Sequence, residues 1–283
     1  MPGPQHANLR AACLGLLSLS AVAGSEVDVL RALYRETLGW GWHHADGWLE
    51  ENTDHCQWRG VTCNSHQKVV ELDFTKNYLR GSLPSTLHML AHLKKLHLAK
   101  NSLNSTLPLR WLHHGVTHLE ELDMSRNGIS GSLPTQLGRL TQLVRLDLSR
   151  NWLHGTLPPE VGRLAKLQML KLDANSLSGT LSAAVQGLTH LRALSIDANA
   201  LSGTLPAAVQ TLTHLRSLSI SNNWLSGTIP KSLGALTQLT HVNLENNRLT
   251  GAVPSELENL TLHPLRKVNL AENTLDSQLK TDL

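Results

Sequence analysis

The stretch Leu143-Val-Arg-Leu146-Asp-Leu148-Ser-Arg-Asn151-Trp-Leu-His-Gly155-Thr-Leu-Pro158 contains the pattern on which most of the chain is built. It joins a Leu-x-x-Leu-x-Leu-x-x-Asn string to an x-Leu-x-Gly-x-Leu-Pro string. A fixed period of this length is the signature of a repeat architecture. The asparagine recurs in the same frame, 24 or 26 residues apart, at Asn77, Asn101, Asn127, Asn151, Asn175, Asn199, Asn223, Asn247 and Asn273.

Each repeat predicts one short strand, because alternate residues of a strand point to opposite sides and the leucines then share one side. A single repeat cannot bury its leucines, but stacked repeats can. The asparagine amide has donors and an acceptor that can bond backbone groups from one repeat to the next. Proline after the last leucine favours short 3-10 or irregular turns on the side opposite the strands. We therefore expect an α/β repeat solenoid of about nine repeats over residues 67–283.

Composition excludes several classes of protein. The 283 residues have a formal net charge of +3, too small a surplus to indicate a nucleic-acid groove. No apolar run reaches the 18 residues of a membrane-spanning helix. Three cysteines cannot form a four-cysteine zinc site, and no Gly-rich phosphate loop or nucleophile–base arrangement is evident. We expect no enzyme activity, cofactor, metal, nucleic-acid partner or integral membrane segment.

The N-terminal residues 1–23 have the pattern of a secretory signal peptide. Arg10 precedes an apolar stretch over residues 11–20, and Ala21-Val22-Ala23 gives a small-x-small cleavage pattern before Gly24. An ordinary N-terminal helix is the alternative. Ser25 and Asp28 then predict a capped helix, with one apolar face formed by Leu30, Leu33, Tyr34 and Leu38.

The repeat resembles the plant-type, 24-residue leucine-rich repeat, whose asparagine is followed by Leu-x-Gly-x-(Ile/Leu)-Pro. The chain is similar to the ectodomains of plant receptor-like kinases and to polygalacturonase-inhibiting proteins, and such modules are also known from algae and other protists. The resemblance implies a leucine-rich-repeat horseshoe with a parallel β-sheet on its concave face. It also places the protein outside the cell or on the cell surface.

The N-terminal cap supports the same resemblance. Cys56-Gln-Trp58-Arg-Gly60-Val-Thr-Cys63 is similar to the Cys-x-Trp-x-Gly-Val-x-Cys cap of the family. The resemblance implies a Cys56–Cys63 disulfide in a helical cap over residues 24–66, with Trp58 over the open end. Two reduced thiols in a cytosolic protein are the alternative. Polygalacturonase inhibitors normally end in a cysteine cap, which this sequence lacks, so a secreted protein and a truncated receptor both remain open.

Two outward columns of the repeats supply candidate ligand-binding residues. Lys76, Lys100, Arg126 and Arg150 precede the asparagine in four adjacent frames. At about 4.8 Å between strands, this ladder is about 14 Å long on the strand face. It suits an anion such as uronate, sulfate or an acidic peptide; a mixed, solvated charge face is the alternative, since acidic residues occupy neighbouring columns. After the asparagine come three aromatic residues able to stack on sugars or anchor a partner: Tyr78, Trp152 and Trp224.

The sequence predicts a secreted or cell-surface recognition module. It would bind a protein, peptide or polysaccharide through the concave face, with a membrane receptor as a candidate partner. An inhibitor of a cell-wall-degrading enzyme, an adhesion or structural wall protein and an intracellular scaffold are the alternatives. Glycosylation sequons begin at Asn104 and Asn259, and they are used only if the chain enters the secretory pathway.

Overall fold

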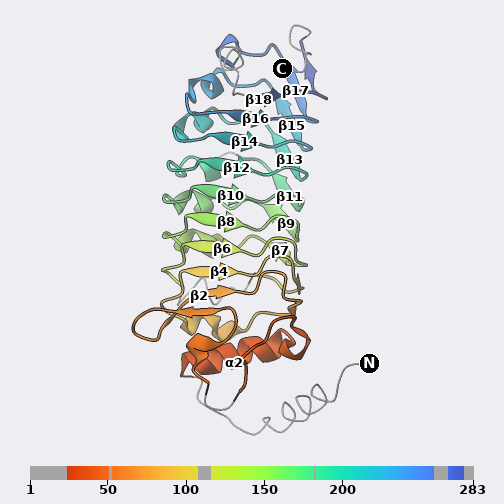
Figure 1. Cartoon of the computed structure of the whole chain (residues 1–283). Coiled ribbons are helices and arrows are strands. Elements are labelled where there is room, and N and C mark those ends of the chain that lie inside the picture. Colours follow the sequence, from red (N-terminus) through yellow and green to blue (C-terminus); the bar gives the residue numbers. More distant parts are fainter. Residues whose placement is uncertain (1–23, 51–52, 108–115, 182, 258–266, 277–283) are drawn as a thin grey trace.

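The protein is an elongated column of stacked coils, one coil per repeat (Figure 1). The computed structural model describes residues 24–50, 53–107, 116–181, 183–257 and 267–276. The predicted signal peptide at residues 1–23 and the sequon residue Asn259 lie outside the described residues.

The cap begins with helix α2 (Glu26–Glu36). Its predicted capping box is confirmed: the Ser25 hydroxyl accepts a hydrogen bond from the Asp28 backbone N–H at 3.2 Å, and the Asp28 carboxylate accepts one from the Ser25 N–H at 3.4 Å. The helix buries Leu30, Leu33 and Tyr34. The assignment of Leu38 to this face was wrong, because the helix ends before it and Leu38 has a φ of 55° and is 36% exposed.

Aromatic side chains close the N-terminal end of the column. Trp42, Trp48 and Trp58 are buried, with ring centroids 4.9 Å apart for Trp42–Trp48 and for Trp48–Trp58. Trp42 also lies 5.0 Å from Phe74, which belongs to the first repeat. The predicted Cys56–Cys63 disulfide is present and joins 3-10 helix η2 (His55–Gln57) to strand β1 (Val61–Cys63). These contacts fix the cap against the repeats.

The main sheet has ten strands. Strand β1 is antiparallel to β2, and the following neighbours are parallel, as predicted. Each strand is in register with the corresponding residues of the next repeat, so that Leu146 lies between Leu122 and Leu170 and all three are buried. After β1 the strands are β2 (Val69–Asp73), β4 (Lys95–His97), β6 (Glu121–Asp123), β8 (Arg145–Asp147), β10 (Met169–Lys171), β12 (Ala193–Ser195), β14 (Ser217–Ser219), β16 (His241–Asn243) and β18 (Lys267–Asn269).

A second parallel sheet, which the sequence did not predict, runs along the adjoining side of the column (Figure 1). Most of its segments follow the pattern x-Leu-x-Gly, in which alternate residues point to opposite sides and the leucine is buried. In the segment at residues 128–131 the buried residue is Ile129. The glycine is required by close packing: Gly179 has a φ of 78°, and a Cβ atom there would lie 2.8 Å from Thr156. The strands are β7 (Ser130–Ser132), β9 (Trp152–Thr156), β11 (Ser176–Gly179), β13 (Ala200–Gly203), β15 (Trp224–Gly227), β17 (Arg248–Gly251) and β19 (Thr274–Leu275); β3 (Arg80–Gly81) pairs separately with β5 (Ser102–Leu103).

In six coils of the described part of the chain, a short 3-10 helix connects the second side of the coil to the next main-sheet strand, which confirms the expected turns. Most begin directly after a proline, such as Pro134 before η4 or Pro158 before η5. Their apolar residues complete the leucine core. The segments are η3 (Ser85–Met89), η4 (Thr135–Arg139), η5 (Pro159–Arg163), η6 (Ala183–Val185), η7 (Ala207–Thr211) and η8 (Lys231–Ala235).

The repeat asparagines bond neighbouring coils together, as predicted. Asn127 is buried; its Nδ2 donates to the carbonyls of Leu98 at 2.9 Å and Met124 at 3.1 Å, and its Oδ1 accepts from the N–H of Leu103 at 3.0 Å. Leu98 and Leu103 belong to the preceding repeat. The asparagine ladder thus holds each turn at a fixed place relative to the next, and it positions the exposed residues that flank it.

Candidate ligand-binding surface

The four cations predicted as a ladder form one row along the side of the column. We call Lys76, Lys100, Arg126 and Arg150 the basic row. Their placement on the strand face was wrong: each lies three residues beyond the end of its main-sheet strand, in a turn, with φ between 55° and 59°. The left-handed turn is held by backbone bonds to the next coil, such as Lys76 N–H to Ala99 O and Lys100 N–H to Ser125 O, both 2.9 Å.

No ion pair neutralises the basic row within the part of the chain that the structure describes. All four side chains are exposed. The ion pairs of the main sheet instead join Lys95 to Glu71 at 3.9 Å and to Glu121 at 3.8 Å. The pKa of Lys100 is lowered, chiefly by the charge of Lys76 and further by loss of solvation and by Arg126. The row therefore carries concentrated positive charge.

The nearby aspartates are occupied by local backbone bonds. Asp73 accepts from the N–H of Thr75 at 2.9 Å, and Asp123 accepts from that of Ser125 at 2.9 Å. Asp147 accepts from Ser149 in the same way. These bonds hold the carboxylates toward the turn backbone. The charge of Asp123 still raises the pKa of Lys100 against the larger effect of Lys76, so the acidic residues offset part of the positive charge of the basic row without an ion pair to it among the described residues.

The aromatic residues are exposed as predicted, but they fall into two places. Tyr78 is 60% exposed and Trp152 is 73% exposed; they lie in the first and fourth repeats of the basic row, two residues beyond Lys76 and Arg150. Between them the same column contains Ser102 and Gly128. The structure therefore combines the basic row with an aromatic residue at either end and small residues between.

Trp224 is separate from this surface. It starts β15, three repeats beyond Trp152, and is 53% exposed. Arg248 of the next repeat lies over its ring, with the guanidinium carbon 5.6 Å from the centroid. This arrangement is a cation–π contact within the chain.

A hydrogen-bonded carboxylate cluster on the second half of the main sheet was missed from the sequence. Ser195 donates its hydroxyl proton to Asp173 of the preceding repeat. Ser219 donates likewise to Asp197 at 2.7 Å, and the N–H of Ser221 donates to Asp197 at 2.6 Å. Burial raises the pKa of Asp173 and outweighs the opposing effect of Ser195. A sequence pattern that could have indicated this cluster is an aspartate followed by a serine on the next strand, as in Asp173 and Ser195 or Asp197 and Ser219.

The predicted glycosylation residue Asn104 is exposed. Among the described residues, the helices are too short or too polar to cross a membrane.

Comparison with known families identifies the repeats. The family described as Leucine rich repeat N-terminal domain matches residues 23–64, and Leucine rich repeat families match residues 118–140, 142–164 and 189–249. The chain is therefore a leucine-rich-repeat protein with a leucine-rich-repeat N-terminal domain, and its relatives include plant receptor-like proteins.

Phytosulfokine receptor 1 of Arabidopsis thaliana is 35% identical over 68 residues, which are 23% of this chain and 7% of that protein. The ectodomain of the Arabidopsis thaliana receptor kinase GASSHO1/SCHENGEN3, solved with CASPARIAN STRIP INTEGRITY FACTOR 2, has a TM-score of 0.71 and 28% identity, over 88% of this chain and 32% of that chain. The plant peptide hormone receptor RGFR1, solved with RGF2, has a TM-score of 0.65 and 29% identity, over 78% and 42%. The chain thus spans less than half the length of these proteins, and it matches the repeat regions of the receptors.

Proposed function

We propose that this protein is an extracellular recognition module that binds an acidic, extended peptide. The basic row, together with Tyr78 and Trp152, is the proposed contact surface. The observation that carries the proposal is the line of four exposed cations in consecutive repeats, with no ion-pair partner among the described residues. Two of the similar proteins were solved with a bound partner, and one of them is a plant peptide hormone receptor.

The geometry favours an extended chain over a compact ligand. The row spans about 14 Å, the length of roughly four extended residues at about 3.3 Å each. Aromatic side chains at both ends can pack against apolar residues of the peptide, while Ser102 and Gly128 leave room for its backbone. Backbone hydrogen bonds between coils hold the four turns in line, so the backbone of the protein needs little ordering on binding.

Secretion is part of the proposal. The disulfide is typical of an oxidising compartment, and residues 1–23 have the pattern of a signal peptide. Glycosylation at Asn104 and Asn259 follows from the same route. The intact mass of the protein, purified separately from the medium and from the cytosol of a eukaryotic culture, tests this point. We expect the protein in the medium, with cleavage after Ala23, one disulfide and attached sugar. An uncleaved chain without sugar in the cytosol would contradict secretion.

A synthetic peptide array tests the ligand class. Peptides of twelve residues, matched in length and hydrophobic content, would carry zero, two or four Asp or Glu residues. We expect retention to rise with the number of acidic residues and with a flanking aromatic or aliphatic residue. Retention that is independent of acidic content, or highest for basic peptides, would overturn the proposal.

A further inference from the structure

We propose that the Cys56–Cys63 clasp, once reduced, becomes a zinc site completed by His55. The two cysteines are joined in the structure, so the site exists only in the dithiol form. In that form the cap offers two thiolates and an imidazole, a ligand set that Zn²⁺ prefers. The ligand atoms of these three residues lie within 4.8 Å of one another.

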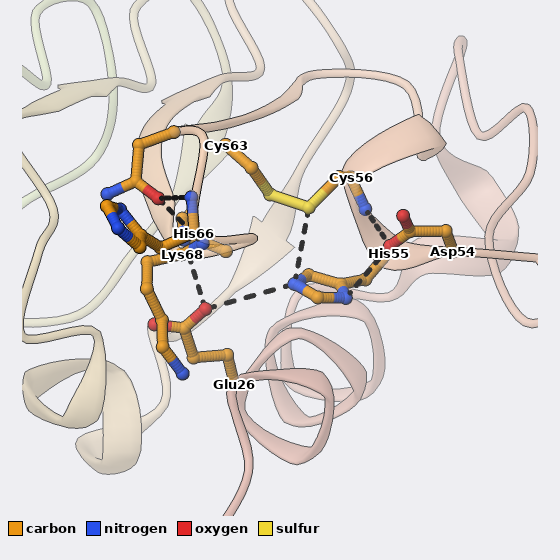
Figure 2. The surroundings of a disulfide bond; sticks show 9 residues. Glu26, Asp54, His55, Cys56, Cys63, His66 and Lys68 are labelled. Carbon is orange, nitrogen blue, oxygen red and sulfur yellow. Dashed lines mark hydrogen bonds and ion pairs between the residues drawn. A yellow bond between two sulfur atoms is a disulfide. The ribbon is translucent and has the colours of Figure 1, made fainter.

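His55 is placed as a ligand and not only as a neighbour. Its Nε2 is 3.5 Å from the sulfur of Cys56, and its side chain is only 15% exposed (Figure 2). A tetrahedral zinc ion with Zn–S bonds of about 2.3 Å and Zn–N bonds of about 2.0 Å separates nitrogen and sulfur ligands by about 3.5 Å. Rotation of the freed cysteines must open the two sulfurs to about 3.8 Å, and the Cα atoms are already 5.5 Å apart.

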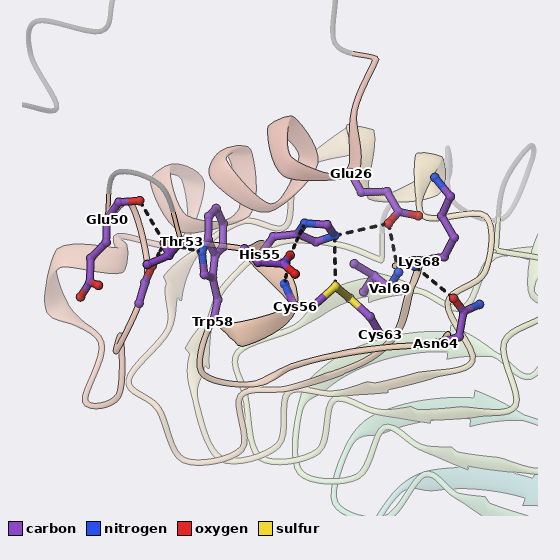
Figure 3. A network of polar contacts seen from close by, with 12 residues as sticks. Glu26, Glu50, Thr53, His55, Cys56, Trp58, Cys63, Asn64, Lys68 and Val69 are labelled. Atoms are coloured by element: carbon purple, nitrogen blue, oxygen red, sulfur yellow. Dashed lines mark hydrogen bonds and ion pairs between the residues drawn. A yellow bond between two sulfur atoms is a disulfide. The ribbon is translucent and has the colours of Figure 1, made fainter. Parts of the chain in front are cut away.

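Two carboxylates support this imidazole. Asp54 lies 3.3 Å from Nδ1 of His55 on the side away from the sulfur. A carboxylate in that position holds the proton on Nδ1 and leaves the Nε2 lone pair for a metal. Glu26 lies 3.8 Å from Nε2 and is the nearest further oxygen donor for a fourth ligand position. The N–H of Val69 donates to Glu26 at 3.0 Å and orients it (Figure 3).

The disulfide and the zinc site are mutually exclusive, because both use the sulfur atoms of Cys56 and Cys63. A dithiol reductant transfers two electrons and two protons to the disulfide, the Sγ–Sγ bond breaks to give two thiols, and the reductant closes to its own disulfide. Zn²⁺ then replaces the two thiol protons, which pass to solvent. The cap is thereby held by a covalent bond under oxidising conditions and by zinc under reducing conditions.

Cobalt substitution tests the site in the full chain. All samples carry Cys13→Ser, so that Cys56 and Cys63 are the only cysteines. Protein is reduced with a dithiol, freed of reductant under argon and titrated with Co²⁺, and the bound Co²⁺ is then displaced by Zn²⁺. We expect one Co²⁺ per reduced chain, with thiolate charge-transfer absorption and the intense visible bands of a tetrahedral site. The oxidised chain, which keeps all its histidines, should show neither band.

Variants separate the ligand from its surroundings. His55→Ala should weaken Zn²⁺ binding more than about tenfold, and Asp54→Ala about tenfold; both are first checked for a cooperative thermal transition in the oxidised state. His66→Ala, an exposed histidine of the same cap (Figure 2), is the matched control and should bind as the parent does. Absence of thiolate bands in the reduced parent, or equal affinities for His55→Ala and His66→Ala, would overturn the proposal.

Discussion

The side chain of Asn151 donates a hydrogen bond from Nδ2 to the carbonyl oxygen of Met124, 27 residues earlier, at 3.0 Å. The same nitrogen also donates to Leu148 O at 3.0 Å, and Oδ1 accepts from Ile129 N–H at 3.0 Å. One buried amide thus satisfies backbone groups of two successive coils. Because Asn151 is buried, its removal leaves those groups without partners.

Asn151→Ala should lower the free energy of unfolding by at least about 2 kcal/mol, since several buried backbone groups lose their partner at once. Urea unfolding followed by circular dichroism measures the change. Asn104→Ala, made in unglycosylated protein, removes an exposed amide and should change the stability by less than about 0.5 kcal/mol. Equal effects of the two substitutions would show that the asparagine ladder does not hold the coils together.

Removal of the cap disulfide should destabilise the oxidised protein. In the chain-entropy model a short loop such as that between Cys56 and Cys63 contributes about 2–3 kcal/mol. Cys56→Ser combined with Cys63→Ser, measured with a metal chelator present, should therefore melt below the oxidised parent. If the oxidised parent and this variant melt at the same temperature, the disulfide does not stabilise the cap.

Asp173 should make the protein less stable as pH rises through the acidic range. Its folded-state pKa lies above the ordinary value because of burial, so between the two values the folded protein binds more protons than the unfolded chain. The free energy of unfolding then falls with increasing pH in that window. Asp173→Asn removes this cost while keeping an oxygen acceptor for Ser195.

We expect Asp173→Asn to raise the melting temperature at pH 7, with the gain shrinking as pH falls below the ordinary aspartate pKa. Melting curves from pH 3 to pH 7 check this, with Asp46→Asn at an exposed aspartate as the control. A variant less stable than the parent at pH 7 would mean that the hydrogen bonds of the ionised carboxylate with the Ser195 hydroxyl and the Asp197 N–H stabilise the protein by more than its burial costs.

Trp152 and Trp224 should differ in their contribution to binding. Trp152 ends the basic row, whereas Trp224 lies three repeats away under Arg248. Trp152→Ala should weaken binding of an acidic peptide at least about tenfold, as truncation of an aromatic anchor does. Because the Trp152 side chain is 73% exposed, the melting temperature of this variant should equal that of the parent protein. Trp224→Ala is the control; if it weakens binding as much as Trp152→Ala, the proposed surface is misplaced.

The sequence predicted the main sheet because two aliphatic or aromatic residues separated by one residue recur in every frame. Buried leucines such as Leu122, Leu146 and Leu170 are in register from one repeat to the next. It did not predict the second sheet, since four-residue segments such as Ser176–Gly179 end in glycine and become strands only beside their neighbours. The basic row was predicted because its four cations occupy the same position in consecutive repeats. Its place in a turn beyond the strand was not predicted, because no local sequence pattern indicates the left-handed backbone conformation of Arg150.

In the cap, too, some features could be predicted from the sequence and others depend on tertiary contacts. Cysteine spacing and resemblance to the family predicted the Cys56–Cys63 pair, which the structure contains. The contact of His55 with Asp54 is between neighbours in the sequence. Its contact with Glu26 depends on helix α2 meeting η2 across the cap, a tertiary arrangement that sequence spacing does not encode. The bonds from Ser195 to Asp173 and from Ser219 to Asp197 likewise join different repeats.

The most direct test of the proposed function is the affinity of the best acidic peptide from the array, measured by calorimetry at low and high salt. Three proteins are compared: the parent, Lys100→Glu combined with Arg126→Glu, and Arg163→Glu combined with Arg192→Glu. The third has the same change in net charge at two exposed arginines outside the basic row.

We predict that the basic-row variant loses at least about tenfold in affinity at low salt, equivalent to about 1.4 kcal/mol. The loss should shrink at high salt, because screening weakens the contacts that the substitutions remove. The control variant should bind nearly as the parent does. Equal losses at both salt concentrations, or equal losses in the two variants, would contradict recognition of an acidic peptide by the basic row.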